Sequence, residues 1–205
     1  MCGIAGVFGK AEPATVELML RRIAYRGPDD EFLVSGPRFT LGARRLSILD
    51  VEGGRQPLSN ETGTVWATQN GELYNFPELR PALETKGHHF RTRTDTEIIP
   101  HLYEDWGAEF PSRLLGMFAI AVWDDAKKIG LLARDRMGKK PLAYAETDRG
   151  LAFGSELQAL LTLPIDRSVD DVAIRYPDGS VQGKADRVRL VFDVGYMKMA
   201  AEGKL

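Results

Sequence analysis

Four short apolar segments that follow one another closely in the second half of the chain restrict the fold more than any other feature. They are rich in β-branched and aromatic residues and cover residues 117–123, 129–134, 142–146 and 151–154. Segments of this length and spacing predict antiparallel strands joined by hairpins. The helical patterns are grouped apart from these strands instead of alternating with them, so we expect an α+β fold and not a regular βαβ sheet.

The first half of the chain contains three further strand patterns. A glycine-broken apolar run covers residues 2–8, and two others cover residues 39–45 and 64–69. The last of these leads directly into Asn70-Gly71, a dipeptide that favours positive φ and a tight reversal. We therefore expect a buried strand at the N-terminus and a turn at Asn70-Gly71.

Three helices are predicted between these strands, and a further short helix is expected around residues 112–115. The first begins at Pro13 and turns Leu18, Met19 and Ile23 toward the core. The second begins after Asn75, because a glutamate three residues later gives the spacing of a capping box. The third covers residues 94–106 and places Asp95 in its first turn, where a negative charge favours the helix dipole.

Composition and charge exclude several classes of function. The chain has 27 basic and 29 acidic residues, a net charge of -2 and a pI near 6.0, so no overall positive field holds a nucleic-acid backbone. No apolar run approaches the roughly 18 residues of a membrane span, and the N-terminus lacks the basic region of a secretory signal. A single cysteine suits a reducing compartment. We expect a cytoplasmic protein without nucleic-acid or membrane partners.

The single cysteine, Cys2, directly follows the initiator methionine. We expect removal of Met1, because the second side chain is small, and this leaves a thiol and a free amino group on one residue. An α-amino group has an ordinary pKa of about 7.7 to 8.0, so it can accept a thiol proton near neutral pH. This pairing is the thiol counterpart of an N-terminal threonine nucleophile and needs no histidine. The alternative is a small buried side chain without a chemical role.

Five short motifs occur in order along the chain. They are Met-Cys-Gly-Ile-Ala-Gly at 1–6, Arg-Gly-Pro-Asp at 26–29, Arg-Leu-Ser-Ile at 45–48, Asn-Gly-Glu-Leu-Tyr-Asn at 70–75 and Thr-Asp-Thr-Glu at 94–97. Together with Ala-Arg-Asp-Arg at 133–136 and Gly-Ser-Glu-Leu at 154–157, they resemble the glutaminase domain of asparagine synthetase B and related class II glutamine amidotransferases. The resemblance runs to about residue 164 and implies the four-layer αββα sandwich of the N-terminal nucleophile hydrolases.

This resemblance implies hydrolysis of L-glutamine to L-glutamate and ammonia. Cys2 would attack the side-chain amide and form a glutamyl thioester, which water then cleaves. Asn70 and the backbone amide of Gly71 match the oxyanion hole, where one donor contributes roughly 3 to 4 kcal/mol in other enzymes. The resemblance implies no metal or organic cofactor for this reaction.

It also implies the residues that bind the substrate. Arg45 matches the arginine that holds the α-carboxylate, a task that suits its planar two-pronged donor. Asp95 and Glu72 match the groups around the α-ammonium. The backbone of the next turn would line the same pocket, at Leu46, Ile48 and Leu49.

Each of these assignments has a simpler alternative. Arg45 is also explained as a surface cation, Asn70-Gly71 as a hairpin turn alone, and Asp95 as a charge that only stabilises a helix N-terminus. The chain's histidines suggest a papain-like pairing with the thiol, or a metal site with nearby acids: His88, His89 and His101. Because isolated histidines are usually structural, with the first two preceding a predicted strand and the third in mid-helix, we assign no metal ligand.

The sequence departs from the family pattern in ways that bear on its partners. Tyr25 stands where histidine is more common, and Ala143 replaces a common tyrosine. The Ser-Gly-Gly-x-Asp-Ser loop of the ATP-using synthetase domain is missing, so ATP and magnesium would act only in a lost domain or a partner subunit. We divide the chain into a glutaminase domain at 1–165 and a remainder at 166–205. That remainder holds a closing hairpin near 172–182, an edge-strand pattern at 188–194, and otherwise an unrecognised or truncated tail.

Two other functions fit the same sequence. A non-catalytic module could keep the fold as a glutamine-sensing or partner-binding unit, and retention of Met1 would enforce this. The same glutaminase chemistry also serves amidophosphoribosyltransferases and glucosamine-phosphate synthesis, although the motif at 70–75 favours the asparagine synthetase branch.

Overall fold

Two antiparallel sheets form the centre of the molecule in a computed structural model, which describes residues 2–10, 12–47, 50, 53–167 and 189–190. One sheet has the strand order β10 (Arg189–Leu190), β8 (Ala143–Thr147), β9 (Gly150–Gly154), β1 (Gly3–Gly9), β3 (Phe39–Arg45) and β2 (Asp30–Gly36). The other has the order β4 (Leu58–Ser59), β5 (Val65–Leu73), β6 (Gly116–Asp124) and β7 (Ile129–Arg134). The predicted hairpins between β6 and β7 and between β8 and β9 are confirmed.

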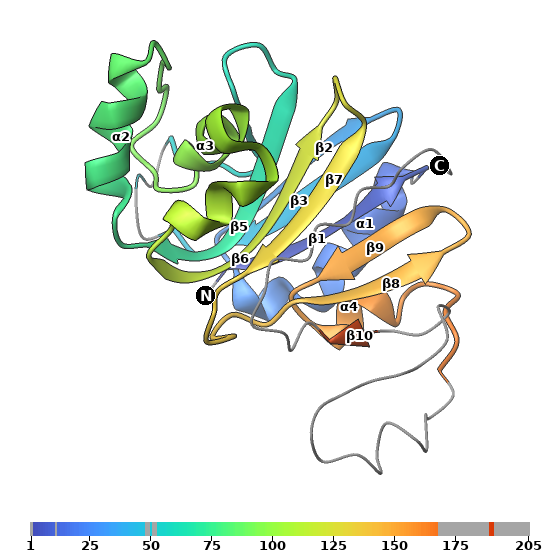
Figure 1. The fold of residues 1–205 in the computed structure, drawn as a ribbon. Coiled ribbons are helices and arrows are strands. Elements are labelled where there is room, and N and C mark those ends of the chain that lie inside the picture. The colour runs from blue at the N-terminus through green and yellow to red at the C-terminus, as the bar shows by residue number, and fades with distance from the viewer. Residues whose placement is uncertain (1, 11, 48–49, 51–52, 168–188, 191–205) are drawn as a thin grey trace.

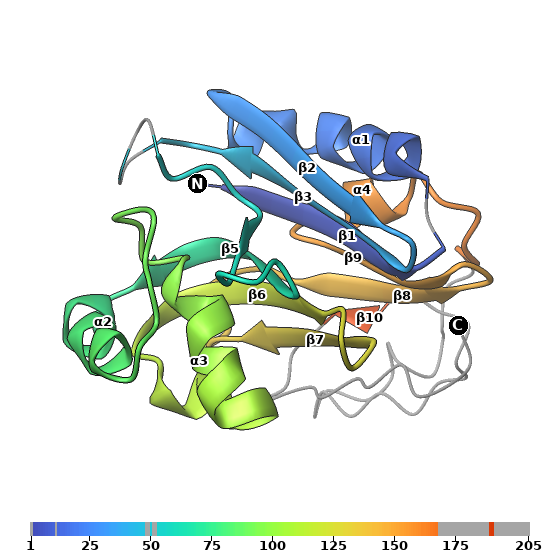
Figure 2. The same cartoon turned by 90° about the horizontal axis from the view of Figure 1, so that it is seen from above.

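Helices cover the outer face of each sheet, as Figure 2 shows. The sheet that contains β1 is covered by α1 (Pro13–Arg22) and α4 (Leu157–Leu160). The other is covered by α2 (Phe76–Thr85) and α3 (Ile98–Trp106), which lie in front of β5 and β6 in Figure 1. Two 3₁₀ segments, Ala24–Arg26 and Gly107–Arg113, follow α1 and α3. The layers therefore run helix, sheet, sheet, helix, as the sequence predicted.

Three apolar cores separate the four layers, and strand alternation explains how one strand serves two of them. On β6, Trp123 packs between the sheets, whereas Ile120 and Val122 pack under α2 and α3. On β1, Phe8 points between the sheets and Val7 points toward α1. Strands buried on both faces are apolar throughout, and this is why these segments were readily predicted.

An aromatic cluster fills the space between the sheets. The ring of Phe8 lies 5.8 Å from that of Trp123 and 5.2 Å from that of Phe153, and Phe39 lies 5.5 Å from Trp123. Such contacts contribute about 0.5–1.5 kcal/mol each beyond the area they bury. This cluster joins β1 and β3 of one sheet to β6 of the other, and these strands, with β5, carry the candidate site described below.

Several local predictions were wrong. The strand at Asn70-Gly71 does not turn, because β5 continues to Leu73 and pairs with β6 along its whole length. Leu18 is 44% exposed and does not face the core, whereas Met19 and Ile23 are buried as predicted. The short helix expected at 112–115 is the 3₁₀ segment Gly107–Arg113.

Two side chains that were predicted to act at helix N-termini, Asn75 and Asp95, make other contacts. Asn75 makes no side-chain cap to α2; its amide binds Arg113 O and Leu115 N across the chain. Asp95 lies before α3, which begins at Ile98, so it is not in the first turn of that helix. In both cases a contact distant in sequence replaces the local one.

The remaining differences concern segments with weak patterns. The sequence did not predict β2, β4 or α4. His88 and His89 were expected to precede a strand, but a loop follows them. Part of the expected edge strand at 188–194 is present as β10 beside β8. The closing hairpin near 172–182 lies outside the described residues, and the division at residue 165 stays a prediction.

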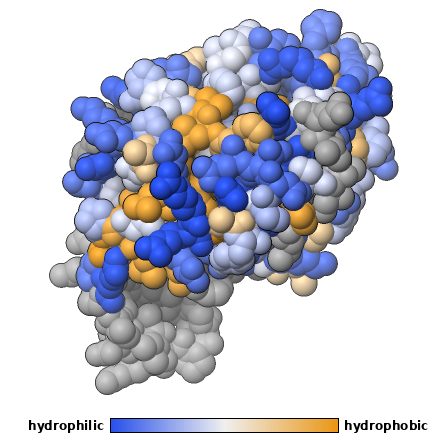
Figure 3. All heavy atoms as spheres, turned by 180° about the vertical axis from the view of Figure 1, so that it is seen from behind, coloured by the Kyte–Doolittle hydropathy of each residue, from blue (hydrophilic) through white to orange (hydrophobic). Residues whose placement is uncertain are grey.

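The side of the molecule opposite α2 and α3 carries apolar surface among charged surface, as Figure 3 shows. Its large exposed apolar side chains on α1 and α4 include Leu18 and Leu157. Among the described residues, no helix has the length and apolar character that crossing a membrane requires.

Candidate active site

A cavity of about 230 Å³ opens at the end of the sandwich where β1 begins and β3 ends. Both sheets contribute to it, together with the loop that precedes α3. Its lining residues are Cys2, Arg45, Leu46, Gly54, Gln56, Asn70, Gly71, Glu72, Thr94, Asp95, Thr96, Met117 and Lys140. The fold thus gathers residues that lie far apart in the sequence around one small space.

Cys2 stands at the first position before β1, a central strand between β9 and β3. Its thiol is half-buried and contacts the backbone of Leu46, with Sγ 3.5 Å from the nitrogen and 3.7 Å from the oxygen. The backbone oxygen of Cys2 accepts a hydrogen bond of 3.1 Å from Arg26 Nε. Arg26 also pairs with Glu156, so its buried guanidinium ties the nucleophile candidate to the end of β9.

Arg26 therefore has a positioning role that the sequence analysis did not assign. It belongs to the Arg-Gly-Pro-Asp motif at 26–29, whose glycine and proline by themselves indicate only a loop. Gly27 is required there because a Cβ atom would lie 2.3 Å from the backbone carbon of Arg44. The motif brings the Arg26 side chain under Cys2 through this close backbone approach.

Asn70 is the most informative residue of the cavity. It is fully buried on β5, yet neither its amide nitrogen nor its amide oxygen has a hydrogen-bond partner in the described protein. Buried polar side chains almost always have partners, and an exception calls for an explanation. An unpaired N–H donor in the wall of a cavity that also holds a thiol is the arrangement expected of an oxyanion hole.

Gly71 follows on β5 and faces Phe118 of β6. A Cβ atom here would lie 2.1 Å from the backbone oxygen of Met117, so only glycine lets the two strands approach. The close approach, and not a positive φ, explains this glycine. It keeps the backbone beside Asn70 at the cavity wall.

Arg45 ends β3 and is 4% exposed. Its Nη2 donates to the backbone oxygen of Asp50 at 2.7 Å. Gly54 leaves room for this guanidinium, since a Cβ there would lie 2.6 Å from the same Nη2. The cavity therefore has a cation on its wall that neighbouring backbone holds in place, not a surface arginine. In contrast, Arg44 pairs outside the cavity with Glu31 at 2.6 Å.

Asp95 also lines the cavity and contacts β5. Its Oδ2 accepts hydrogen bonds of 2.8 Å from the backbone nitrogen of Leu73 and from Gln69 Nε2. Burial raises the pKa of this carboxyl above its ordinary 3.8, although the two hydrogen bonds act in the opposite direction. Glu72 is exposed at the rim and adds a second negative charge.

The loop that carries Asp95 is held by the last residue of its motif. Glu97 is fully buried, and its carboxylate accepts bonds from the backbone nitrogens of Arg91 and Thr92 at 2.7 and 2.6 Å. Asp50 Oδ2 accepts a further bond of 2.8 Å from the nitrogen of Arg93. These contacts fix the loop from both sides, a task that the sequence pattern does not reveal.

The cavity unites most of the predicted site. The structure places seven of the predicted residues in its lining: Cys2, Arg45, Leu46, Asn70, Gly71, Glu72 and Asp95. Ile48 and Leu49 lie outside the described residues. None of the three histidines lines the cavity, so no imidazole of the chain stands beside the thiol there.

Sequence reasoning missed several lining residues. Thr94 and Thr96 flank Asp95 within a motif that had been recognised, so that motif was the available signal. Gln56 and Lys140 had no local signal, because only the fold brings them to the cavity. Asp135 positions Lys140 by accepting its backbone N–H at 3.0 Å.

Known proteins share this sequence and fold. Asparagine synthetase [glutamine-hydrolyzing] 2 of Bacillus subtilis (strain 168) is 43% identical over 171 residues, which are 80% of this chain and 23% of that protein. Asparagine synthetase [glutamine-hydrolyzing] of Zea mays is 41% identical over 166 residues, 78% of this chain and 28% of that protein. The chain thus spans less than a third of the length of these relatives.

A solved structure with a similar fold is the glutamine phosphoribosylpyrophosphate amidotransferase of B. subtilis complexed with ADP and GMP. It gives a TM-score of 0.64 at 22% identity, over 78% of this chain and 43% of that chain. The predicted family and four-layer fold are confirmed. Residues 1–181 match the family described as the glutamine amidotransferase domain, and the chain is therefore a member of that family.

Proposed function

We propose that this chain hydrolyses L-glutamine to L-glutamate and ammonia, with Cys2 as the nucleophile. One observation carries the proposal: Asn70, a fully buried asparagine without hydrogen-bond partners in the described part of the chain, lines the same cavity as the chain's single thiol. The thiol supplies a nucleophile and the unpaired amide supplies a donor for developing negative charge.

The reaction proceeds in two steps. Removal of Met1 frees the amino group of Cys2, which takes the thiol proton while Sγ bonds to the side-chain carbonyl carbon of glutamine. The oxyanion that forms is stabilised by Asn70 Nδ2 and the backbone N–H of Gly71. The same amino group returns the proton to the departing nitrogen, and ammonia leaves a glutamyl thioester. Water then attacks the thioester and releases glutamate and the thiol.

The charges of the cavity suit the zwitterionic end of an amino acid. Arg45 offers a planar pair of donors to an α-carboxylate. Asp95 and Glu72, which line the same cavity, offer negative charge to an α-ammonium. We propose that these groups select glutamine over amides without an α-amino acid group, and that hydrolysis uses no metal or organic cofactor because Cys2 supplies the nucleophile directly.

The ammonia has a proposed destination. The relatives named above are glutamine-hydrolysing asparagine synthetases, and this chain spans 23% to 29% of such proteins. We propose that an ATP-using synthetase, in a further domain or a partner subunit, consumes the ammonia with ATP and magnesium. We also propose a cytoplasmic location, because a reducing compartment keeps the nucleophilic thiol in its reduced form.

The test compares the wild-type chain with Cys2→Ala. Intact mass establishes whether Met1 is absent, and ammonia and glutamate release are measured for both proteins. We expect turnover to fall at least about 10⁴-fold in Cys2→Ala, because the nucleophile is lost. Equal rates, with glutamine still bound in calorimetry, would instead identify a non-catalytic glutamine-binding module. Hydrolysis by protein that retains Met1 would refute the amino group as the proton acceptor.

A matched pair of variants tests substrate orientation. Arg45→Lys keeps the positive charge but loses the planar fork, so we expect KM for glutamine to rise about 10- to 100-fold. Arg44→Lys is the control, because Arg44 binds Glu31 and the backbone of Gly27 outside the cavity. An equal KM in the two variants would remove Arg45 from the binding site.

A further inference from the structure

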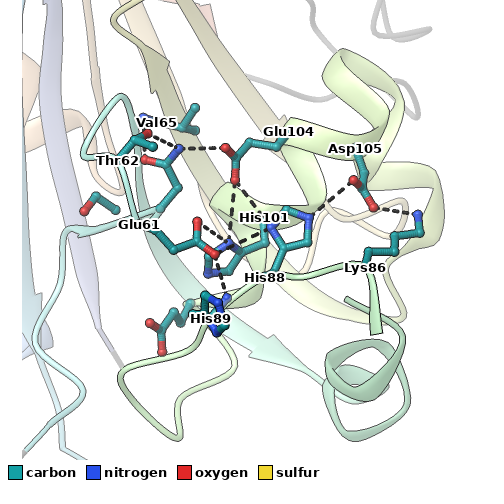
Figure 4. Close-up of polar contacts among 12 residues, drawn as sticks. Glu61, Thr62, Val65, Lys86, His88, His89, His101, Glu104 and Asp105 are labelled. Carbon is teal, nitrogen blue, oxygen red and sulfur yellow. Dashed lines mark hydrogen bonds and ion pairs between the residues drawn. The ribbon is translucent and has the colours of Figure 1, made fainter. Parts of the chain in front are cut away.

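A second group of chemically active side chains lies away from the cavity. Glu61 comes from the turn between β4 and β5, His88 from the connection between α2 and α3, and His101 and Glu104 from α3. One ligand atom from each lies within 4.8 Å of the others, and Figure 4 shows the four side chains converging. The i,i+3 spacing of His101 and Glu104 places both on one face of the helix.

The separations between the facing atoms have the size expected around one metal ion. His88 Nδ1 is 3.6 Å from Glu104 Oε2 and 3.8 Å from Glu61 Oε1. His101 Nδ1 is 3.5 Å from Glu61 Oε2 and 3.6 Å from Glu104 Oε2. Two ligands bound tetrahedrally to zinc at 2.0–2.1 Å lie about 3.3 Å apart, so only a small closing movement separates this arrangement from a coordination shell.

His101 supplies an independent observation. Its side chain is 1% exposed, and neither ring nitrogen has a hydrogen-bond partner among the described residues. A buried imidazole without a hydrogen bond destabilises the fold unless one of its nitrogens binds a metal ion.

The outer contacts orient His88 as a ligand. Its Nε2 lies 3.3 Å from Asp105 Oδ1, and Lys86 Nζ holds the other oxygen of Asp105 at 2.6 Å. A carboxylate on the far nitrogen fixes the proton there and leaves Nδ1 with a lone pair directed at the cluster. Metal-binding histidines are typically supported in this way.

The two glutamates are held in the same manner. Glu104 Oε1 accepts a bond of 2.8 Å from Asn60 Nδ2, and Glu61 Oε1 accepts one of 2.6 Å from the backbone nitrogen of His89. Each carboxylate is thereby fixed through one oxygen while its Oε2 faces His101. Two carboxylates with two neutral imidazoles leave a charge of -2, which a divalent cation balances.

We propose that Glu61, His88, His101 and Glu104 form a structural zinc site. Imidazole and carboxylate ligands suit zinc, and four protein ligands complete a tetrahedron without an open catalytic position. The ion joins the turn before β5, the loop after α2 and helix α3. The site shares no residue with the cavity around Cys2, so it goes beyond the proposed function and is independent of it. It also departs from the sequence prediction that no histidine is a metal ligand.

The experiment uses the full chain in a Cys2→Ala background, because the thiol itself binds zinc. The protein is treated with EDTA, dialysed and titrated with Zn²⁺ in a calorimeter, and with Co²⁺ while visible absorption is recorded. We expect one ion per chain, intense d–d bands from a tetrahedral cobalt site, and a rise in Tm of about 5–10 °C at a hundredfold excess over Kd.

Four variants assign the ion to its ligands. His88→Gln and Glu104→Gln are expected to lose at least 100-fold in zinc affinity, and Asp105→Asn is expected to lose about 10- to 100-fold through His88. His89→Ala is the matched control, because it removes an exposed neighbouring imidazole and leaves the four ligands in place. Circular dichroism establishes that each variant folds.

Two results overturn the proposal. One is the absence of stoichiometric Zn²⁺ and Co²⁺ binding to the folded parent, which would make the cluster an ion-pair network around a buried histidine. The other is unchanged zinc affinity in both His88→Gln and Glu104→Gln, which would place the ion elsewhere.

Discussion

The hairpin formed by β4 and β5 contains two buried asparagines, one beside β4 and one on β5. The first side chain is fully hydrogen-bonded, whereas the second has no hydrogen bond to the described residues. Asn60, beside β4, and Asn70, on β5, are both fully buried. Asn60 accepts bonds from the backbone nitrogens of Thr64 and Val65 at 2.9 and 3.0 Å and donates to Glu104 at 2.8 Å. Among the residues that the structure describes, neither the nitrogen nor the oxygen of the Asn70 amide has such a partner.

The difference distinguishes a structural amide from the one for which we propose a role in catalysis. Burying a polar group is tolerated when it is paired, as at Asn60, where the side chain holds the turn together. At Asn70 the burial of an amide without hydrogen bonds lowers the stability of the fold. We therefore attribute this residue to the proposed reaction and not to the stability of the fold. Both residues are asparagine and both are fully buried, so only their hydrogen bonds distinguish the two roles.

The strongest test of this difference replaces each asparagine by alanine. Asn70→Ala is expected to lower kcat for glutamine hydrolysis about 10²- to 10³-fold, because a donor to the oxyanion is lost. Its free energy of unfolding should change by less than about 1 kcal/mol, since no hydrogen bond is broken. Kinetics and urea denaturation measure the two effects.

Asn60→Ala is expected to behave in the opposite way. It leaves two backbone N–H groups without acceptors, so the free energy of unfolding should fall by about 2–4 kcal/mol. The kcat of the folded fraction should be unchanged. The measurements are made with EDTA so that metal binding does not contribute. Equal loss of activity in both variants would show that Asn70 only supports the fold.

Smaller effects on stability and activity are expected from substitution of the glycines near these asparagines, Gly71 on β5 and Gly63 in the turn before β5. Gly71→Ala forces a Cβ atom to 2.1 Å from the Met117 oxygen, so β5 and β6 must separate beside Asn70. We expect a loss of about 2–3 kcal/mol in stability and of roughly 10- to 100-fold in kcat/KM, because the oxyanion donors move.

Gly63→Ala is the matched control in the turn. Gly63 has a φ of 71° with open space around it, so alanine there costs about 1 kcal/mol through its backbone conformation alone. Its kcat/KM should equal that of the wild type. If Gly71→Ala were fully active, the close approach of the strands would not be what positions the site.

The sequence predicted the strands that form continuous apolar runs. Strands β1, β6 and β7 are apolar on both faces because they lie between two cores, so their patterns are strong. Strand β2 is half-exposed and begins with two acidic residues, and β4 has only two residues. Neither has a face long enough to produce a clear pattern, which explains why both were missed.

The site was predicted where short motifs carry it and missed where tertiary contacts do. Asn70, Arg45 and Cys2 stand in recognised motifs, and the cavity contains all three. The role given to Asp95 at a helix N-terminus was wrong, because bonds to β5 hold its carboxylate before α3 begins. A metal site with nearby acids was considered from the histidines alone and not assigned, because the two histidines and two glutamates of the cluster come from three separate segments that only the fold brings together.

The smallest expected effect concerns Asp95, the carboxylate that joins the α3 loop to the functional half of β5. Its pKa is raised by burial, so it becomes protonated at a higher pH than an ordinary aspartate. A neutral acid attracts the α-ammonium of glutamine less strongly. We therefore expect kcat/KM to fall as pH decreases through the raised pKa, by about tenfold, the difference between a charged and a neutral hydrogen-bond acceptor.

Asp95→Asn should remove this acidic limb and lower kcat/KM at neutral pH to the same plateau. The sign for stability is opposite. Because the folded pKa lies above the unfolded one, Asp95 stabilises the fold at low pH, and this contribution is lost as pH rises through the folded pKa. Relative to the wild type, Asp95→Asn is therefore expected to be more stable at pH 7 than near pH 3. An acidic limb that persists in the variant would assign it to another group and leave Asp95, like Asn60, with a structural role only.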